Sequence, residues 1–207
     1  MLFHKHKLIF VGIPKNASHA PLAALNNKTD RHHDHQSFIQ IYHENDEELL
    51  DTYTSFAIVR NPYDRTYSCW NYLRQIEYLE DRFDIHSFED FIFALDARNK
   101  FNREEQNEEL TQHELTYPQH KFIAFKGVIL VDKVLKFENL DADWKEFADD
   151  YNSKKPQFKI RDHLSIHNSM EYEERDWTKI YTPEMYKIVN DFYKKDFELF
   201  NYEMRTK

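Results

Sequence analysis

Two short segments of the chain each combine a cation with the start of a helix. The first, Ile13-Pro14-Lys15-Asn16-Ala17-Ser18-His19-Ala20, follows an apolar run and carries Lys15. The second extends from Val59 to Ser68, with Arg60 at its beginning, directly after another apolar run. The N–H groups at a helix start attract anions, and a nearby Lys or Arg adds positive charge. Each segment is therefore a candidate phosphate-binding loop, although either one taken alone is more often a structural turn.

The usual glycine-rich nucleotide motifs are absent from the sequence. It contains neither the G-x-x-x-x-G-K-[ST] pattern of ATP and GTP sites nor the G-x-G-x-x-G pattern of dinucleotide sites. Only 2 of the 207 residues are glycine, Gly12 and Gly127, whereas ordinary proteins have about 7%. The two loops together therefore indicate a nucleotide of a different kind.

Alternating strands and helices are expected to position the two loops. Apolar runs at 7–13 and 54–60 are typical of strands buried on both faces, and each precedes a helix, at 18–26 and from Asn61-Pro62 to about 78. The other expected elements are a helix at 87–97 capped by Ser87, a strand at 128–137, a helix from Asn139 to about 151, and a helix from Thr182 to about 200. This order predicts one α/β domain over residues 1–207, with a mainly parallel central sheet flanked by helices in three layers. The polar segments 99–119 and 157–179 are expected to form loops or partly helical insertions near the site.

Composition and charge narrow the possible partners. The formal net charge is −9 and the pI is about 5.7, which speaks against non-specific binding to nucleic acid or to an anionic membrane. No apolar run approaches the roughly 18 residues that a membrane span needs. The only cysteine, Cys69, cannot form an internal disulfide and is expected to be a packing residue. We therefore expect a cytoplasmic protein, whose oligomeric state the sequence leaves open.

Both loops resemble those of a known family. Ile9-Phe10-Val11-Gly12-Ile13-Pro14-Lys15-Asn16-Ala17-Ser18 looks like the strand and 5′-phosphosulfate loop of the sulfotransferases that use 3′-phosphoadenosine-5′-phosphosulfate (PAPS), particularly the carbohydrate-type branch. Residues 56–68 resemble the 3′-phosphate motif of that family, whose Arg and downstream Ser hold the phosphate. Weaker similarity at 131–140, 167–169 and 196–202 extends the resemblance over most of the chain. It implies a P-loop-like fold and transfer of a sulfuryl group to an acceptor hydroxyl, without a metal, leaving adenosine 3′,5′-bisphosphate.

The resemblance also assigns roles to individual residues. Six consecutive residues would hold the 5′-phosphosulfate: Lys15, Asn16, Ala17, Ser18, His19 and Ala20. Arg60 and Ser68 would hold the 3′-phosphate, and Lys15 would also stabilise the charge that develops on the leaving oxygen. The sequence departs from the family pattern at Asn16, where Thr is usual, and at His19-Ala20, which replace a Thr-Ser type pair. Asn16 can still donate through its side-chain amide, and His19 through a ring nitrogen.

A histidine-rich segment, Arg31-His32-His33-Asp34-His35-Gln36-Ser37-Phe38, lies between the two loops. One interpretation is metal binding by His33 and His35 with Asp34 or His43, but the spacing matches no recognised zinc motif. A second is a solvated loop without a role, and a third is a general base, since the pKa of histidine suits proton transfer near neutral pH. The segment resembles the His-x-His-x-Ser-Phe-like stretch of heparan-type 2-O-sulfotransferases, which favours His35 as the base. His33 would then support it or orient the acceptor, and it is also the alternative base.

Two other classes of protein remain compatible with the sequence. A P-loop-type kinase of a nucleotide or small alcohol would share the architecture, but it should carry a Ser or Thr for Mg²⁺ in its phosphate loop. A non-catalytic nucleotide-binding module of the same fold is the other alternative. If the protein is a sulfotransferase, its acidic character is a poor match for a polyanion such as heparan. We therefore expect the hydroxyl-bearing acceptor to be a glycan, a lipid or a small alcohol.

Overall fold

The computed structural model describes residues 1–25, 35–96, 110, 113–164 and 177–207, and these belong to two compact units. The first unit comprises residues 1–60 and 119–173, and the second comprises residues 61–118 and 174–207. Each unit has a hydrophobic core of its own. Compact units of this size can also be parts of one domain, so the single domain expected over the whole chain stays a prediction.

A four-stranded sheet forms the centre of the first unit. Its order is β1 (Leu2–Phe3), β2 (Leu8–Val11), β3 (Thr54–Val59) and β6 (Lys133–Lys136). β2 is parallel to β3 and β3 is parallel to β6, whereas β1 pairs with β2 in the antiparallel direction at the edge of the sheet. The expected mainly parallel sheet is therefore confirmed.

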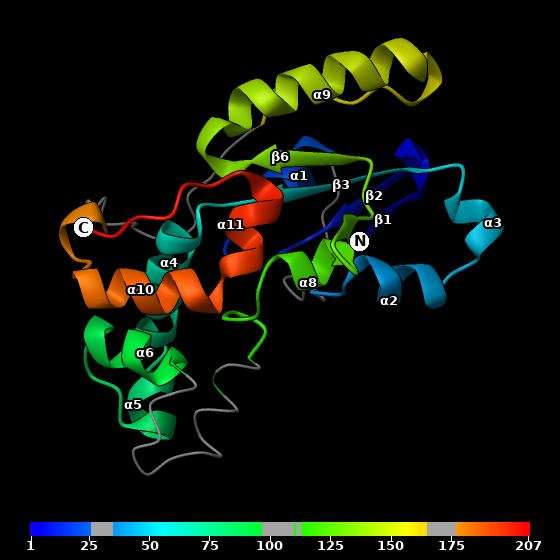
Figure 1. Ribbon diagram of the computed structural model, residues 1–207. Helices are drawn as coiled ribbons and strands as arrows, with labels where there is room; N and C mark the ends of the chain where they lie inside the picture. Colours follow the sequence, from blue (N-terminus) through cyan, green and yellow to red (C-terminus); the bar gives the residue numbers. More distant parts are fainter. Residues whose placement is uncertain (26–34, 97–109, 111–112, 165–176) are drawn as a thin grey trace. The chain divides into compact units, whose positions relative to one another are not determined.

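Helices cover both faces of this sheet. Successive side chains of a strand point to opposite faces, and one face of β2 and β3 carries Phe10 and Phe56, whose rings stack with centroids 4.8 Å apart. These rings pack with α1 (His19–Ala24) and α9 (Leu140–Lys154) in one core, where Trp144 is fully buried. Figure 1 shows α9 on one side of the sheet and the neighbouring pair α2 (Phe38–His43) and α8 (His120–Ile123) on the other. The α/β fold with a flanked central sheet, expected from the sequence, is thereby confirmed.

The prediction of one continuous strand at 128–137 is wrong, because the segment forms two separate strands. It is divided into β5 (Val128–Ile129), which pairs with β4 (Ala124–Phe125) in a separate hairpin, and β6. Asp132 interrupts the run, because its carboxylate accepts hydrogen bonds from the N–H and the hydroxyl of Ser55, both at 2.7 Å. The hairpin turns at Lys126 and Gly127, which have φ values of 49° and 82°. Gly127 thus provides the left-handed conformation that a two-residue hairpin loop requires.

The second unit is helical in its described residues. Its helices are α4 (Pro62–Gln75), α5 (Tyr78–Phe83), α6 (Phe88–Leu95), α10 (Pro183–Phe192) and α11 (Lys194–Phe200). The predicted cap Ser87 is confirmed, and Asn61 and Thr182 cap the helices that were expected to begin there, since each side chain accepts a backbone N–H of its helix. The remaining short elements are α3 (Glu47–Leu50) in the first unit and four 3₁₀ turns: His4–His6, Phe137–Asn139, Pro156–Phe158 and Trp177–Lys179.

Two helices and one cap differ from the sequence prediction. The helix from Pro62 ends at Gln75, because Glu77 adopts a left-handed φ of 58° before α5 begins. The last helix is interrupted at Tyr193, which separates α10 from α11. Asn139 precedes α9 as predicted but makes no side-chain capping bond, because a 3₁₀ turn occupies residues 137–139.

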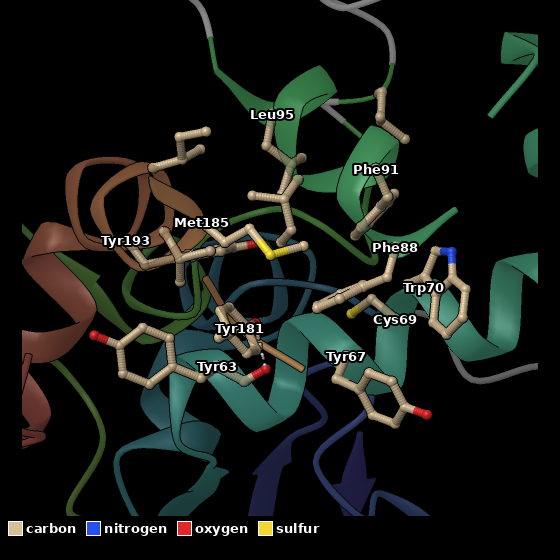
Figure 2. Close-up of a cluster of buried hydrophobic side chains, with 14 of the residues drawn as sticks. Tyr63, Tyr67, Cys69, Trp70, Phe88, Phe91, Leu95, Tyr181, Met185 and Tyr193 are labelled. Atoms are coloured by element: carbon tan, nitrogen blue, oxygen red, sulfur yellow. Dashed lines mark hydrogen bonds between the residues drawn. The ribbon is translucent and has the colours of Figure 1, made fainter. Parts of the chain in front are cut away.

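Aromatic side chains dominate the core of the second unit. Figure 2 shows Tyr63, Tyr67, Trp70, Phe88 and Tyr181 converging with aliphatic side chains from α6 and α10. Many of these rings meet edge to face, the geometry that aromatic pairs prefer. These aromatic residues therefore belong to the packing.

Among the described residues, no helix is both long enough and apolar enough to cross a membrane.

Candidate anion-binding site

Within the first unit, the sheet brings the loop after β2 next to Arg60, the residue that directly follows β3. β2 and β3 are parallel neighbours with Val11 opposite Ala57, so both strands end at the same edge of the sheet. The loop after β2 and Arg60 after β3 therefore lie side by side. The Arg60 guanidinium donates from Nη1 to the carbonyl oxygen of Lys15 at 3.0 Å. This edge is the carboxyl end of the strands, where open α/β sheets bind their ligands.

The loop after β2 forms a concave backbone surface. Lys15 and Ala17 have left-handed φ values of 66° and 56°, while Ser18 is right-handed at φ −55°. Alternating left- and right-handed residues turn successive N–H groups toward one point and make an anion-binding nest. The N–H groups of Ala17 and Ser18 donate to no acceptor in the described part of the chain. The Ser18 hydroxyl fixes the loop by donating to the Ile13 carbonyl at 3.1 Å.

His35 lies beside this loop. Its Nδ1 is 2.7 Å from the carbonyl oxygen of Gly12, the residue that follows β2. A carbonyl oxygen only accepts hydrogen bonds, so Nδ1 must carry the proton in this contact. In the neutral ring the lone pair is then on Nε2, which is the arrangement that a general base needs. The structure thus gives His35, which precedes α2, a defined tautomer at the edge of the loop.

Positive charge is concentrated around the nest. His19, the first residue of α1, has a lowered pKa because it is partly desolvated and because Lys15 and His35 repel its protonated form. This repulsion requires the three side chains to be close together. The protein is acidic as a whole, yet it collects a lysine and two histidines around a loop whose N–H groups converge. An anion bound there would relieve the repulsion among them.

Arg60 is buried rather than extended into solvent. Its side chain is 4% exposed, and the guanidinium carbon lies 4.1 Å from the centroid of the Phe137 ring. Arginine stacks readily on aromatic faces while its N–H groups continue to donate in the plane of the guanidinium. Phe137, directly after β6, therefore helps to hold the cation at the same sheet edge as Lys15.

The side chain of Asn16 makes hydrogen bonds within the protein. It is 1% exposed, and its Nδ2 donates to the Ile58 carbonyl at 2.8 Å and to Gln119 Oε1 at 2.7 Å. The amide that the sequence suggested for the 5′-phosphosulfate is thus already used inside the protein. Its Oδ1 is buried and accepts no hydrogen bond from the described residues. Asn16 therefore fastens the loop to β3, and its expected contact with the 5′-phosphosulfate stays a prediction.

Gln119 is a site residue that sequence reasoning missed. It is fully buried, accepts the Arg60 N–H at 2.9 Å and donates to the Arg60 carbonyl at 2.8 Å. It belongs to a polar segment with no periodic pattern, and it is far along the chain from both loops. No local signal in the sequence distinguishes it from the many exposed polar residues.

The remaining predicted site residues are placed as follows. Ala20 is buried in α1, and its N–H donates to the Ala17 carbonyl at 3.0 Å, so it supports the start of the helix. Ser68 is a buried residue of α4 and belongs to the second unit, so its joint contact with Arg60 on one phosphate stays a prediction. His33 lies outside the described residues. Over the described ranges, no three His, Cys, Asp or Glu side chains are grouped to hold a metal ion.

The fold is that of an α/β protein, with a candidate anion-binding loop at the carboxyl edge of the parallel strands. Comparison with protein-family models matches residues 1–203 to the sulfotransferase family. The chain therefore belongs to the sulfotransferase family, whose chemistry is the transfer of sulfuryl groups. Comparison with curated proteins and with solved structures gives no match. The match is to the family as a whole, so the carbohydrate-type branch and its histidine motif stay predictions.

Substitutions at Asn16 test how the loop is held. Asn16→Asp should lower the free energy of unfolding by more than about 3 kcal/mol, because a buried carboxylate would face the oxygens of Ile58 and Gln119 without a donor between them. Asn16→Thr keeps one donor and should cost about 1–2 kcal/mol. Denaturant unfolding at neutral pH measures both values. Equal losses in the two variants would show that the donors of Asn16 do not fasten the loop.

The electrostatics of the loop predict a pH effect. NMR titration of the histidine rings should give His19 a pKa below its usual 6.5, and added sulfate should raise it, because a bound dianion offsets the charges of Lys15 and His35. Binding then takes up protons, so sulfate should bind more tightly as the pH falls through the pKa of His19.

An internal control for this titration is His86. A hydrogen bond to Asp84 at 2.8 Å raises the pKa of this exposed ring, and it should not respond to sulfate. Equal movement of both rings would indicate a general salt effect instead of a site at the loop.

Proposed function

We propose that the chain is a PAPS-dependent sulfotransferase that transfers the sulfuryl group to a hydroxyl-bearing acceptor. The observation that carries the proposal is the hydrogen bond between His35 Nδ1 and the Gly12 carbonyl. It leaves Nε2 as the basic nitrogen of a ring that lies beside a loop with the features of an anion site. Family membership supplies the class of reaction, and this contact indicates how the chain performs it.

The residues of the loop fit the 5′ end of such a donor. Two N–H groups, of Ala17 and Ser18, converge where an anion would be held, and Lys15 adds a full positive charge beside them. Arg60 at the same sheet edge, with Ser68 of α4, is proposed to hold the 3′-phosphate. The donor supplies an activated sulfuryl group when it is bound. The protein contributes electrostatic stabilisation, because the Lys15 ammonium faces negative charge developing on the leaving oxygen.

His35 is proposed to accept the proton of the acceptor hydroxyl. Because Gly12 holds Nδ1 in its protonated form, Nε2 takes up the incoming proton and the ring becomes imidazolium. The hydrogen bond to the Gly12 carbonyl persists in that state and becomes charge-assisted, which makes it stronger. The same contact therefore orients the base before the reaction and stabilises its charged form afterwards.

The acceptor is proposed to be a glycan, a lipid or a small alcohol. The chain carries a formal net charge of −9, so a polyanionic acceptor would be repelled at long range. A neutral hydroxyl compound meets no such barrier and needs only to place its oxygen near His35.

The direct test is a transfer assay with sulfur-labelled PAPS against panels of glycans, lipids and small alcohols. Label should appear in an acceptor, and calorimetry should show tight binding of adenosine 3′,5′-bisphosphate without Mg²⁺. Binding of Mg-ATP in preference to the bisphosphate would favour the kinase alternative. Bisphosphate binding without transfer to any acceptor would favour a non-catalytic module.

The role of His35 is tested by a matched pair of variants. His35→Ala should lower kcat by about 10²- to 10⁴-fold, the usual contribution of a general base. His35→Asn should lose as much activity, although its amide can still donate to the Gly12 carbonyl, because it has no basic nitrogen. Both should bind adenosine 3′,5′-bisphosphate nearly as well as the unaltered chain. An active His35→Asn variant would show that the ring serves only to hold the loop.

A further inference from the structure

One buried carboxamide joins the two halves of the proposed nucleotide site. Gln119 Oε1 accepts from the Arg60 N–H at 2.9 Å and from Asn16 Nδ2 at 2.7 Å, and Gln119 Nε2 donates to the Arg60 carbonyl at 2.8 Å. Asn16 adds a bond to the Ile58 carbonyl at 2.8 Å. Both carboxamides are almost completely buried, at 0% and 1% exposure. Together they connect the loop after β2 to the end of β3 by four hydrogen bonds.

The orientations of these two amides are dictated by the backbone. The Arg60 N–H can only donate and the Arg60 carbonyl can only accept, so the oxygen and nitrogen of Gln119 have one arrangement. That arrangement presents Oε1 to Asn16, which must then offer its Nδ2 to both Gln119 and Ile58. Neither amide can rotate without breaking buried hydrogen bonds, each worth about 1 kcal/mol or more.

We propose that Gln119 is a positioning residue that sets the spacing between the Lys15 loop and Arg60, so that both ends of one doubly phosphorylated nucleotide are held at once. This inference rests on the proposed function. Gln119 itself is buried and is proposed to touch no ligand. It contacts the main chain of Arg60, and it contacts the loop through the side chain of Asn16, the residue directly after Lys15. Preorganisation of two anchoring points strengthens simultaneous binding, because less ordering is left to occur when the ligand arrives.

The measurement that isolates this role is a ratio of two affinities. Adenosine 3′,5′-bisphosphate engages both anchoring points, whereas adenosine 5′-monophosphate engages only the loop. The ratio of their dissociation constants reports how well the two points act together. A loss of folded protein weakens both ligands equally, so it leaves the ratio unchanged.

Gln119→Met keeps the length of the side chain but makes none of the hydrogen bonds. In this variant the preference for the bisphosphate should fall by about tenfold, the effect of misplacing one charge-assisted hydrogen bond.

Asn152→Leu is the matched control, since the Asn152 amide makes the same reciprocal pair of bonds, with the Ile160 backbone, at 2.8 and 2.9 Å. It should lower stability but leave the ratio unchanged.

Should Gln119→Met fail to fold, Gln119→Glu tests the same claim. Burial raises the pKa of a carboxyl group, and its protonated form can donate to the Arg60 carbonyl as the amide does. The ratio in this variant, relative to the unaltered chain at each pH, should therefore recover as the pH falls. An unchanged ratio in a folded Gln119 variant would overturn the inference and leave the proposed function intact. An unaltered chain that does not prefer the bisphosphate would instead overturn the proposed function.

Discussion

The parallel pairing of β2 with β3 is the constraint on which the site depends. Parallel neighbours end at the same edge of a sheet, so the residues that follow them must share a small region of space. In this chain those residues are the Lys15 loop and Arg60, and the register of Val11 with Ala57 places them side by side. The strands can pair in this way because their side chains are apolar on both faces and helices cover each face. The chemistry of the site is therefore a consequence of how the sheet is buried.

The loop after β2 adopts left-handed backbone conformations without glycine, the residue that adopts them most readily. Lys15 and Ala17 occupy left-handed conformations that cost a non-glycine residue about 1–2 kcal/mol each. Such conformations persist only where the surroundings determine them. Here the surroundings are specific hydrogen bonds: Ser18 to Ile13, and Asn16 to Ile58 and Gln119. Asn16, which departs from the family pattern, is thus explained as a structural support of the loop. This departure leaves the N–H groups of Ala17 and Ser18 in place.

Local patterns predicted the parts of the fold that local chemistry determines. The apolar runs gave the two central strands, and Asn61, Ser87 and Thr182 gave three helix starts, because a cap and its helix are neighbours in the chain. The interruption at Asp132 escaped prediction because its cause is Ser55, a partner from another strand. Gln119 escaped for the same reason, since it is 59 residues from Arg60 and 103 from Asn16 in the sequence. Residues that act through distant partners leave no periodic signal.

At this sheet edge, basic side chains supply the charge and buried neutral amides fix the backbone. An acidic chain attracts an anion only where basic groups are close enough together to outweigh the net charge. His19 shows the cost of this arrangement, since its pKa is lowered by burial and by the nearby Lys15 and His35. The neutral amides of Asn16 and Gln119 add no charge to this crowded region, yet they fix the backbone that carries it. A lysine or arginine in their place would increase the repulsion, and a carboxylate would compete with the ligand for the cations. A carboxamide both donates and accepts hydrogen bonds without carrying a charge, so a buried amide pair suits the junction between the Lys15 loop and Arg60.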